Sequence, residues 1–461
     1  MRIRKSDIGQ KIKSNLKIEF AHQDVSAHGG LELFRRYFAI IGLQTRIRSA
    51  FKTHGLKGDY TAVHFILVFI ALWFVGGRRL KHIPFIAQDP LVQRLCGLKS
   101  LPSDRSASRW LGQFTNDSLQ ALIELNSEIV SEKLSQLDLA RITLDFDGTV
   151  LSCGDKVKWA MRGYNPMNRH AKSYFPLLCH VAQTGHFFRV MNRPGNVHDA
   201  KGGALAMMKK CIEQIRQSMP GVIIEVRMDA AFFQEDIIKY LLRERIEFVV
   251  KVPMWKWLNL KGIINQRQRW HWADPSLAWF RDEIHVDSWD LDLDLMFFRE
   301  KISDTPKKGH QLDLFTPDDG VYEYYVLLSN KNGRPENILD FFNGRCAMEH
   351  QIAEIKGEFA FDVIPTRHYQ GNSAHQQISL LAYNLVRNFQ IDTQSLQARP
   401  RTASRTNLWE FGSLKTIRFE TINAAARILN LASGKVLRIS HNIAREKSYS
   451  QIIDSLDNLA A

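Results

Sequence analysis

Two short stretches of the chain place carboxylates at the ends of apolar, strand-like runs. Asp145 and Asp147 lie two residues apart in LDFDGT, so on a β-strand both side chains point to the same face of the sheet. Asp229 ends the run VIIEVRMD, where a buried charge is costly unless a metal ion or a cation balances it. Mg²⁺ prefers such oxygen ligands, and converging carboxylates can hold two ions for phosphodiester transfer. The acids therefore predict metal-dependent phosphodiester chemistry.

A third acid is expected from a helical stretch late in the chain, ENILDFFNGRCAMEHQIAEIKGEF. Its candidates are Glu336, Glu349, Glu354 and Glu358. At about 100° per residue, Arg345, Glu349 and Lys356 share an arc of roughly 60° with Phe342, whereas Glu354 lies roughly 160° from Lys356. Arg345, Glu349 and Lys356 therefore form one polar stripe, and Glu349 is the expected third acid.

The elements that carry these acids follow a recognisable order. Residues 140–153, 173–183 and 185–193 predict three successive strands, and a helix, a strand, a helix and a strand follow over 200–219, 222–229, 232–246 and 247–253. The order βββαβαβ, with a later helix, is what an α/β fold with a ribonuclease-H-like mixed-sheet core requires. A doubly wound sheet would alternate strand and helix from its first strand.

Pattern and composition divide the chain into five expected parts. These are a helical N-terminal DNA-binding or dimerisation region (1–135), the first part of the catalytic core (136–253), a β-rich insertion (254–335), the second part of the core (336–395) and a basic C-terminal region (396–461). The most apolar run, 65–75, has about half of the roughly 20 residues that cross a bilayer, so we expect a buried helix there and no membrane partner.

The overall charge favours a polyanionic partner. The 461 residues carry 62 Lys and Arg against 48 Asp and Glu, a net charge of +14, and each phosphate that a basic protein neutralises releases condensed counterions. The excess is concentrated at the ends: residues 1–60 hold 12 basic and 5 acidic side chains, and residues 399–447 hold 10 and 3. Five cysteines without a CxxC pair and the absence of a signal-like stretch favour a cytoplasmic, nucleoid-associated protein.

Two further groups of basic residues are candidate contacts to the DNA backbone. Arg105 and Arg109 are one turn apart on a helix expected to start after Ser103. Arg169 and Lys172 lie in a loop close after the first acid strand. A solvated helix and a merely basic hairpin remain open as alternative interpretations of these two groups.

The third-acid stretch also resembles a known motif. FNGRCAMEHQIAEIK is similar to the signature Y-x-x-R-x-x-x-E-x-x-x-x-x-x-K of a superfamily of bacterial insertion-sequence transposases, with Phe342 where Tyr is usual. The run D-G-T-V beginning at Asp147 resembles the D-x-T strand of the same superfamily. The resemblance implies catalytic and metal-binding roles for Asp147, Asp229 and Glu349, with Asp145 as a possible additional metal ligand.

The stretch MRGYNPMNRHAKSYFPLLCHVAQTGHFFRVMNRPGNVHDA, together with RMDAAFF, resembles the insertion-sequence family numbered 1380. That resemblance implies a DDE transposase that moves DNA by cut and paste. It implies two Mg²⁺ (or Mn²⁺) ions as cofactors, and double-stranded DNA partners in the form of terminal inverted repeats and target DNA. It also implies a homodimer in the synaptic complex, in which Arg345 and Lys356 contact DNA phosphates.

Two other functions fit part of the sequence. LDFDGTVLS is close to the first motif of haloacid-dehalogenase-like phosphatases, in which Asp145 would be the nucleophile and Asp147 the acid and base. That fold should continue as alternating strands and helices, which the predicted order does not do. A non-catalytic DNA-binding protein would use only the basic chain ends, and it leaves the spacing of Arg345, Glu349 and Lys356 unexplained.

Overall fold

Helices build the N-terminal part of the molecule. The computed structural model describes residues 15–19, 24–56, 58–166, 168–197, 200–302, 320–399, 402, 406–432 and 434–461. Among the described residues, seven α-helices precede the strands of the central sheet: α1 (Leu31–Ile40), α2 (Leu43–Ala50), α3 (Ala62–Phe74), α4 (Ile83–Ile86), α5 (Pro90–Cys96), α6 (Asp104–Leu111) and α7 (Asn116–Ser135). Helix α3 is buried along almost its whole length, which confirms the buried helix predicted from the most apolar run. Ser103 caps α6 by accepting a 3.1 Å hydrogen bond from the amide of Ser106.

A nine-stranded mixed sheet forms the centre of the fold, in the order β6-β5-β2-β7-β8-β12-β11-β10-β9. Its strands are β2 (Arg141–Gly148), β5 (Leu177–Val181), β6 (Phe187–Met191), β7 (Ile223–Met228), β8 (Glu247–Val252), β9 (His271–Trp272), β10 (Leu277–Val286), β11 (Leu291–Lys301) and β12 (Tyr322–Ser329). β2, β7 and β8 are parallel, β5 pairs antiparallel with β2, and β6 pairs antiparallel with β5 at the edge of the sheet. Helix α8 (Ala204–Ser218) connects β6 to β7, and α9 (Glu235–Arg243) makes the crossover from β7 to β8.

The predicted element order is confirmed from β2 to β8. The run 140–153, however, contains a second short strand, β3 (Leu151–Cys153), which pairs with β4 (Lys172–Tyr174) in a separate two-stranded sheet. The strands predicted between 254 and 335 are present, and β12 pairs with β8, so they continue the core sheet. The short helix α10 (Leu260–Gln266) lies beside them.

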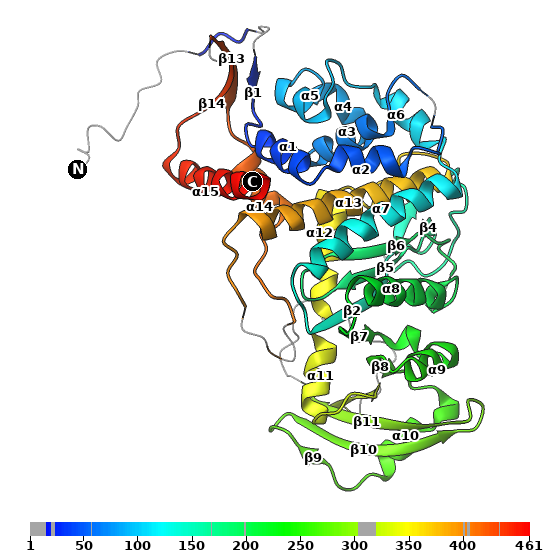
Figure 1. Cartoon of the computed structure of the whole chain (residues 1–461). Helices are drawn as coiled ribbons and strands as arrows, with labels where there is room; N and C mark the ends of the chain where they lie inside the picture. The colour runs from blue at the N-terminus through cyan, green and yellow to red at the C-terminus, as the bar shows by residue number, and fades with distance from the viewer. Residues whose placement is uncertain are drawn as a thin grey trace.

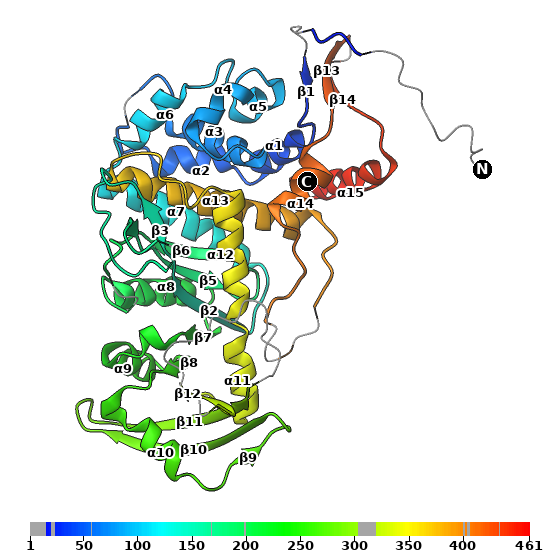
Figure 2. The same cartoon turned by 180° about the vertical axis from the view of Figure 1, so that it is seen from behind.

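The two faces of the sheet carry different helices. α8 and α9 lie on one face and bury their apolar sides against the strands (Figure 1). On the other face run α11 (Pro335–Asn343) and α12 (Cys346–Glu358), which Figure 2 shows in front of the strands. The long helix α13 (Tyr369–Thr393) is buried on nearly all sides, because it packs between the N-terminal helices and β6. α13 therefore joins the N-terminal helices and the sheet in one core.

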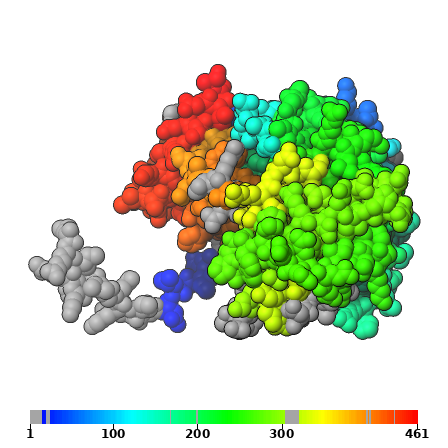
Figure 3. Space-filling view, turned by 90° about the horizontal axis from the view of Figure 1, so that it is seen from below, coloured from blue at the N-terminus to red at the C-terminus, as the bar shows by residue number. Residues whose placement is uncertain are grey.

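A strand near the start of the chain pairs with a strand near its end. β1 (Val25–Ser26) pairs with β13 (Ala426–Leu431), and β13 pairs with β14 (Gly434–Ile439) in a three-stranded sheet. α14 (Leu414–Ile417) precedes this sheet and α15 (Ile443–Ala460) follows it. The basic segments 1–60 and 399–447 are therefore neighbours, although residues 1–14 and 20–23 lie outside the described part. Seen from below, the C-terminal helix lies to one side and the strands of the insertion cover much of the face (Figure 3).

In the part of the chain that the structure describes, no helix combines the length and the apolar character needed to cross a bilayer.

Candidate active site

The register between β2 and β7 places the first two acids side by side. The parallel pairing joins Asp145 to Arg227 and Phe146 to Met228, so the next position along both strands holds Asp147 and Asp229. Adjacent strands are about 4.8 Å apart. Asp229 also caps the short helix after β7, because its side chain accepts a 3.0 Å hydrogen bond from the amide of Ala231. The prediction that these two acids are neighbours is confirmed.

Helix α12 brings Arg345 and Glu349 to the same place. Arg345 Nη1 donates to Asp147 Oδ2 at 2.9 Å, and both side chains are mostly buried, with 15% and 18% exposed. Burial raises the pKa of Asp147 to about 6, with the nearby Asp229 and Glu349 acting in the same direction and Arg345 opposing them. Burial opposes the charge of Arg345, but the surrounding carboxylates raise the pKa of this guanidinium. Three acids from two strands and one helix therefore share one electrostatic centre.

Lys356 lies two turns further along α12 and completes the predicted polar stripe. Its ammonium donates to the carbonyl of Val150 at 3.2 Å, three residues after Asp147. Burial lowers the pKa of Lys356, while Asp362 and Asp147 act in the opposite direction. The lysine is therefore anchored at the end of the strand that carries the first acid.

The other glutamates of this stretch have different partners. Glu354 accepts a 2.8 Å hydrogen bond from Arg387 and one of 2.9 Å from the amide of Leu414. Glu358 pairs with Arg418 at 2.7 Å. Glu336 accepts a 3.0 Å hydrogen bond from the indole of Trp279. These acids fix α11 and α12 to their neighbours, as the helical geometry predicted for Glu354.

One detail of the helix prediction was wrong. We expected a single helix through the stretch, but it forms two, α11 and α12, with Gly344 between them and Arg345 at the start of the second. Phe342 therefore belongs to the end of α11 and packs partly buried beside Phe341 and Leu339. The arc calculated for a continuous helix holds for Glu349 and Lys356, which are both within α12.

Both carboxylate oxygens of Asp145, the expected additional metal ligand, contact other side chains in this structure. Its side chain has no exposed surface, and Arg227 donates to both of its oxygens, from Nε at 2.6 Å and from Nη2 at 2.9 Å. Nδ1 of His180 lies 3.1 Å from the second oxygen. Burial alone would raise the pKa of Asp145, but the Arg227 guanidinium and His180 hold it below its usual value. The same contacts exclude Asp145 as the exposed nucleophile of a phosphatase.

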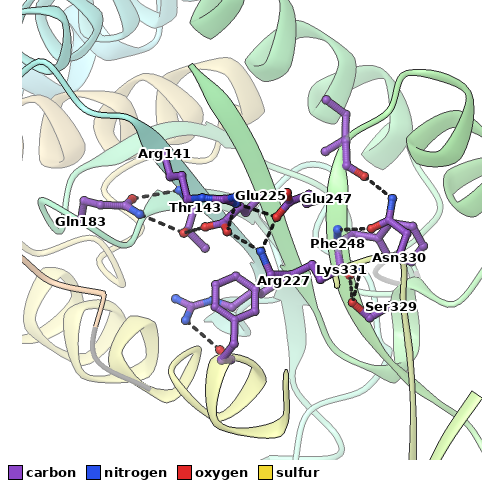
Figure 4. A network of polar contacts seen from close by, with 12 residues as sticks. Arg141, Thr143, Gln183, Glu225, Arg227, Glu247, Phe248, Ser329, Asn330 and Lys331 are labelled. Carbon is purple, nitrogen blue, oxygen red and sulfur yellow. Dashed lines mark hydrogen bonds and ion pairs between the residues drawn. The ribbon is translucent and has the colours of Figure 1, made fainter. Parts of the chain in front are cut away.

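The ion pair of Asp145 is part of a polar network on the face of the sheet beneath α11. Further along the strands, Glu225 accepts from Arg141 at 2.8 Å and from the hydroxyl of Thr143 at 2.7 Å (Figure 4). Glu247 accepts from Arg141 at 2.7 Å, and Lys331 contacts both glutamates. Each buried charge in the network has an opposite partner, as low-dielectric surroundings require. The acids thus lie beside a polar network in which opposite charges are paired.

The predicted DNA contacts outside this centre lie on the surface. Arg105 and Arg109 are exposed on α6 and line a groove with the turn after β3 and the loop before α13. Arg169 is exposed, and Lys172 donates to the carbonyl of Asp155 at 3.1 Å. The structure places these four residues but does not test whether they touch DNA.

The donor set of the centre fits a divalent metal site. The negative charges of Asp229 and Glu349 contribute to the raised pKa of Asp147, and a bound cation would relieve this repulsion. Among the described residues, no group of three His, Cys, Asp or Glu side chains is arranged closely enough to enclose an ion. Here Arg345 supplies the positive charge instead. Asp147, Asp229 and Glu349 are the residues that would hold metal after that ion pair opens.

Sequence reasoning missed Arg227 and His180 as parts of the site. A signal for Arg227 was present, because it is a charge inside the apolar run VIIEVRMD and shares a strand face with Asp229. Nothing in the local pattern around His180 distinguishes it from an ordinary core residue, since its role depends on the pairing of β5 with β2.

Comparisons with known proteins agree with this geometry. The chain matches the family described as Transposase DDE domain group 1 over residues 9–293 and 306–461, nearly its whole length. It therefore belongs to that family. The protein is a DNA transposase, an enzyme that cleaves and transfers DNA strands.

Individual proteins resemble this chain only distantly. Among solved structures, the chain is similar to the piggyBac transposase in a synaptic complex with hairpin DNA, with 10% sequence identity, a TM-score of 0.40, and coverage of 94% of this chain and 85% of that one. The assignment to the transposase family does not depend on this distant similarity. No curated protein matches the sequence.

Proposed function

We propose that Asp147, Asp229 and Glu349 form the catalytic centre of this transposase and hold two Mg²⁺ or Mn²⁺ ions for cleavage and joining of DNA strands. The observation that carries the proposal is the convergence of the three acids: neighbouring strands bring Asp147 and Asp229 together, and Glu349 lies close enough to raise the pKa of Asp147. Two bound ions would activate water or a 3′-hydroxyl and stabilise the leaving oxygen.

The core that carries these acids is ribonuclease-H-like in this proposal. The sheet order β6-β5-β2-β7-β8 supports it, with two antiparallel strands on one side of the first acid strand and parallel strands on the other. Helix α12 then supplies the third acid from outside the sheet. The same order disfavours the phosphatase, since β5 and β6 are antiparallel where that fold needs alternating strands and helices.

The basic residues of α12 have a role in the same reaction. Arg345 neutralises Asp147 in the free protein, and its planar guanidinium would turn to a DNA phosphate once the acids are otherwise balanced. Lys356 is held near the same strand end, where its single charge can meet a second phosphate. Both residues then orient the scissile strand rather than transfer protons.

The finer classification rests on the motif. The spacing of Arg345, Glu349 and Lys356 supports membership of the superfamily with the Y-x-x-R-x-x-x-E-x-x-x-x-x-x-K signature, and the longer stretch MRGYNPMNRHAKSYF supports family 1380. We extend to this chain the properties that this resemblance implies: recognition of terminal inverted repeats and target DNA, cut-and-paste movement and a homodimer in the synaptic complex.

Excision of a marker flanked by the inverted repeats of the gene tests the proposal. We expect Asp229→Asn and Glu349→Gln each to lower excision at least about a thousandfold, since each removes a metal ligand needed in the transition state. Glu235→Gln is the matched control, because Glu235 lies on α9 at the other face and pairs only with exposed Lys239 at 2.8 Å. Excision that persists in Asp229→Asn, or in excess EDTA, would refute the assignment.

A further inference from the structure

The turn that follows β3 exposes two large aromatic side chains. Trp159 is 62% exposed and Tyr164 is 70% exposed, five residues apart in the sequence. Aromatic side chains usually bury most of their surface, and Tyr and Trp are enriched where one protein meets another molecule. The turn therefore has the character of a binding surface, which the acid centre does not account for.

The backbone holds Trp159 in an unfavourable conformation. Its φ is +62°, and it is the only aromatic one among the six non-glycine residues with positive φ in the described part. Two contacts of the preceding residue, Lys158, hold the backbone at this point. The amide of Lys158 donates to the carbonyl of Arg367 at 3.0 Å, and Tyr174 donates to the carbonyl of Lys158 at 2.6 Å. A bulky residue fixed in the left-handed region is strained, and such strain is concentrated at functional sites.

The surroundings of the two aromatics are strongly basic. Lys156, Lys158 and Arg162 are exposed in the same turn. The turn also forms one wall of the groove of about 1150 Å³ whose other walls hold Arg105, Arg109 and Arg367, with Asp155 as its one carboxylate among the described lining residues. Figure 2 shows α6 and β3 at the same edge of the molecule. Positive charge is thus available beside the exposed rings for an anionic chain.

The turn is joined directly to the catalytic strand. β3 starts four residues after Asp147, and Lys356 binds the carbonyl of Val150 between them. A DNA strand that leaves the acid centre along β3 would reach the aromatic turn next.

We propose that the turn of residues 156–164 binds unpaired DNA next to the catalytic centre. Trp159 and Tyr164 stack on bases, and Lys156, Lys158 and Arg162 neutralise the phosphates between them. Every base has an aromatic face, so this site binds unpaired bases and does not distinguish one base sequence from another. This inference rests on the proposed catalytic centre. It specifies that the DNA held beside the cleavage point is unpaired.

Fluorescence anisotropy in EDTA tests the site without cleavage. The two probes are a labelled oligothymidylate of about 20 nucleotides and an abasic strand of the same length and charge, which lacks only the bases. We expect the full-length protein to bind the thymidylate more tightly. Trp159→Ala should lower that affinity about tenfold and leave the affinity for the abasic strand unchanged, and Trp159→Phe should retain most of it.

Two further variants separate stacking from charge and from general damage. Arg162→Gln should weaken binding of both probes alike and reduce the salt dependence by about 0.7 in slope, as for one phosphate contact on a single strand. Phe85→Ala is the matched control, because Phe85 is 87% exposed on α4, in the N-terminal helices. It should change neither affinity.

Trp159→Gly guards against a folding defect, because glycine tolerates the positive φ. It should lose the preference for thymidylate without a lower midpoint of thermal unfolding. Equal binding of the two probes by the unaltered protein, or an equal loss on both probes in Trp159→Ala, would overturn the proposal. Because no metal is present, this result does not depend on metal binding by the acids, and the excision activity of Asp229→Asn separately decides the proposed function.

Discussion

Replacing Asp147 with Asn is expected to stabilise the metal-free protein at neutral pH, although it removes one side of an ion pair. Arg345 contacts Asp147 at 2.9 Å, so a simple count of contacts predicts a loss of stability. Burial and the nearby Asp229 and Glu349 outweigh that contact, because the pKa of Asp147 in the folded chain is about 6 rather than 3.8. The charged form of this carboxyl is therefore disfavoured by folding.

The size of the effect follows from the two pKa values. Asp147 is only 18% exposed, and a pKa of about 6 against 3.8 corresponds to about 3 kcal/mol of unfolding free energy. Because the folded pKa is the higher one, this destabilisation is complete above about pH 6, shrinks as the pH falls, and is absent below 3.8. Asn imitates the protonated acid, so Asp147→Asn should gain up to about 3 kcal/mol at neutral pH and nothing below pH 3.8.

Urea denaturation in EDTA at several pH values measures this difference, with unfolding followed by circular dichroism. Added Mg²⁺ should then stabilise the unaltered protein more than the variant, since the variant lacks one ligand. The reasoning is refuted if Asp147→Asn is less stable than the unaltered protein at neutral pH, or if the difference does not depend on pH.

Three more outcomes follow from the buried ion pairs and the metal site. Arg227→Met should destabilise the protein by about 3–5 kcal/mol because it leaves Asp145 buried without its main partner, and adding Asp145→Leu should recover most of that loss in the same urea assay. Glu354→Gln should lower stability through the loss of the pair with Arg387, while the folded protein keeps excision activity, in contrast to Glu349→Gln. EDTA should abolish excision but leave binding of a duplex carrying the inverted repeat intact in a gel-shift assay, because phosphate contacts by Arg and Lys need no metal.

The sequence predicted the core of the fold because its strands and helices have strong local patterns. The order from β2 to β8 and the insertion strands β10–β12 appear where the periodicity placed them. The acids Asp147 and Asp229 could be predicted as neighbours, since both end apolar runs and adjacent strands of this order bring those ends together. Glu349 could be separated from Glu354 because helix geometry alone puts them on different sides.

Other features depend on contacts that local patterns do not contain. The partners of Asp145 could not be predicted, because Arg227 and His180 reach it from two other strands, which only the register reveals. The division between α11 and α12 occurs at Gly344, although the apolar spacing continues through it. The exposure of Trp159 depends on a positive φ that no composition rule indicates for tryptophan.

The pairing of β1 with β13 has a consequence for how the chain acquires its final structure during synthesis. Val25 pairs with Arg427, so the first strand finds its partner only after some 400 further residues have left the ribosome. At the usual pace of translation this takes roughly 20–80 s, during which the edge of β1 has no β13 to cover it. A product that terminates before β13 lacks this partner strand, so the three-stranded sheet cannot form in it and the edge of β1 stays unpaired.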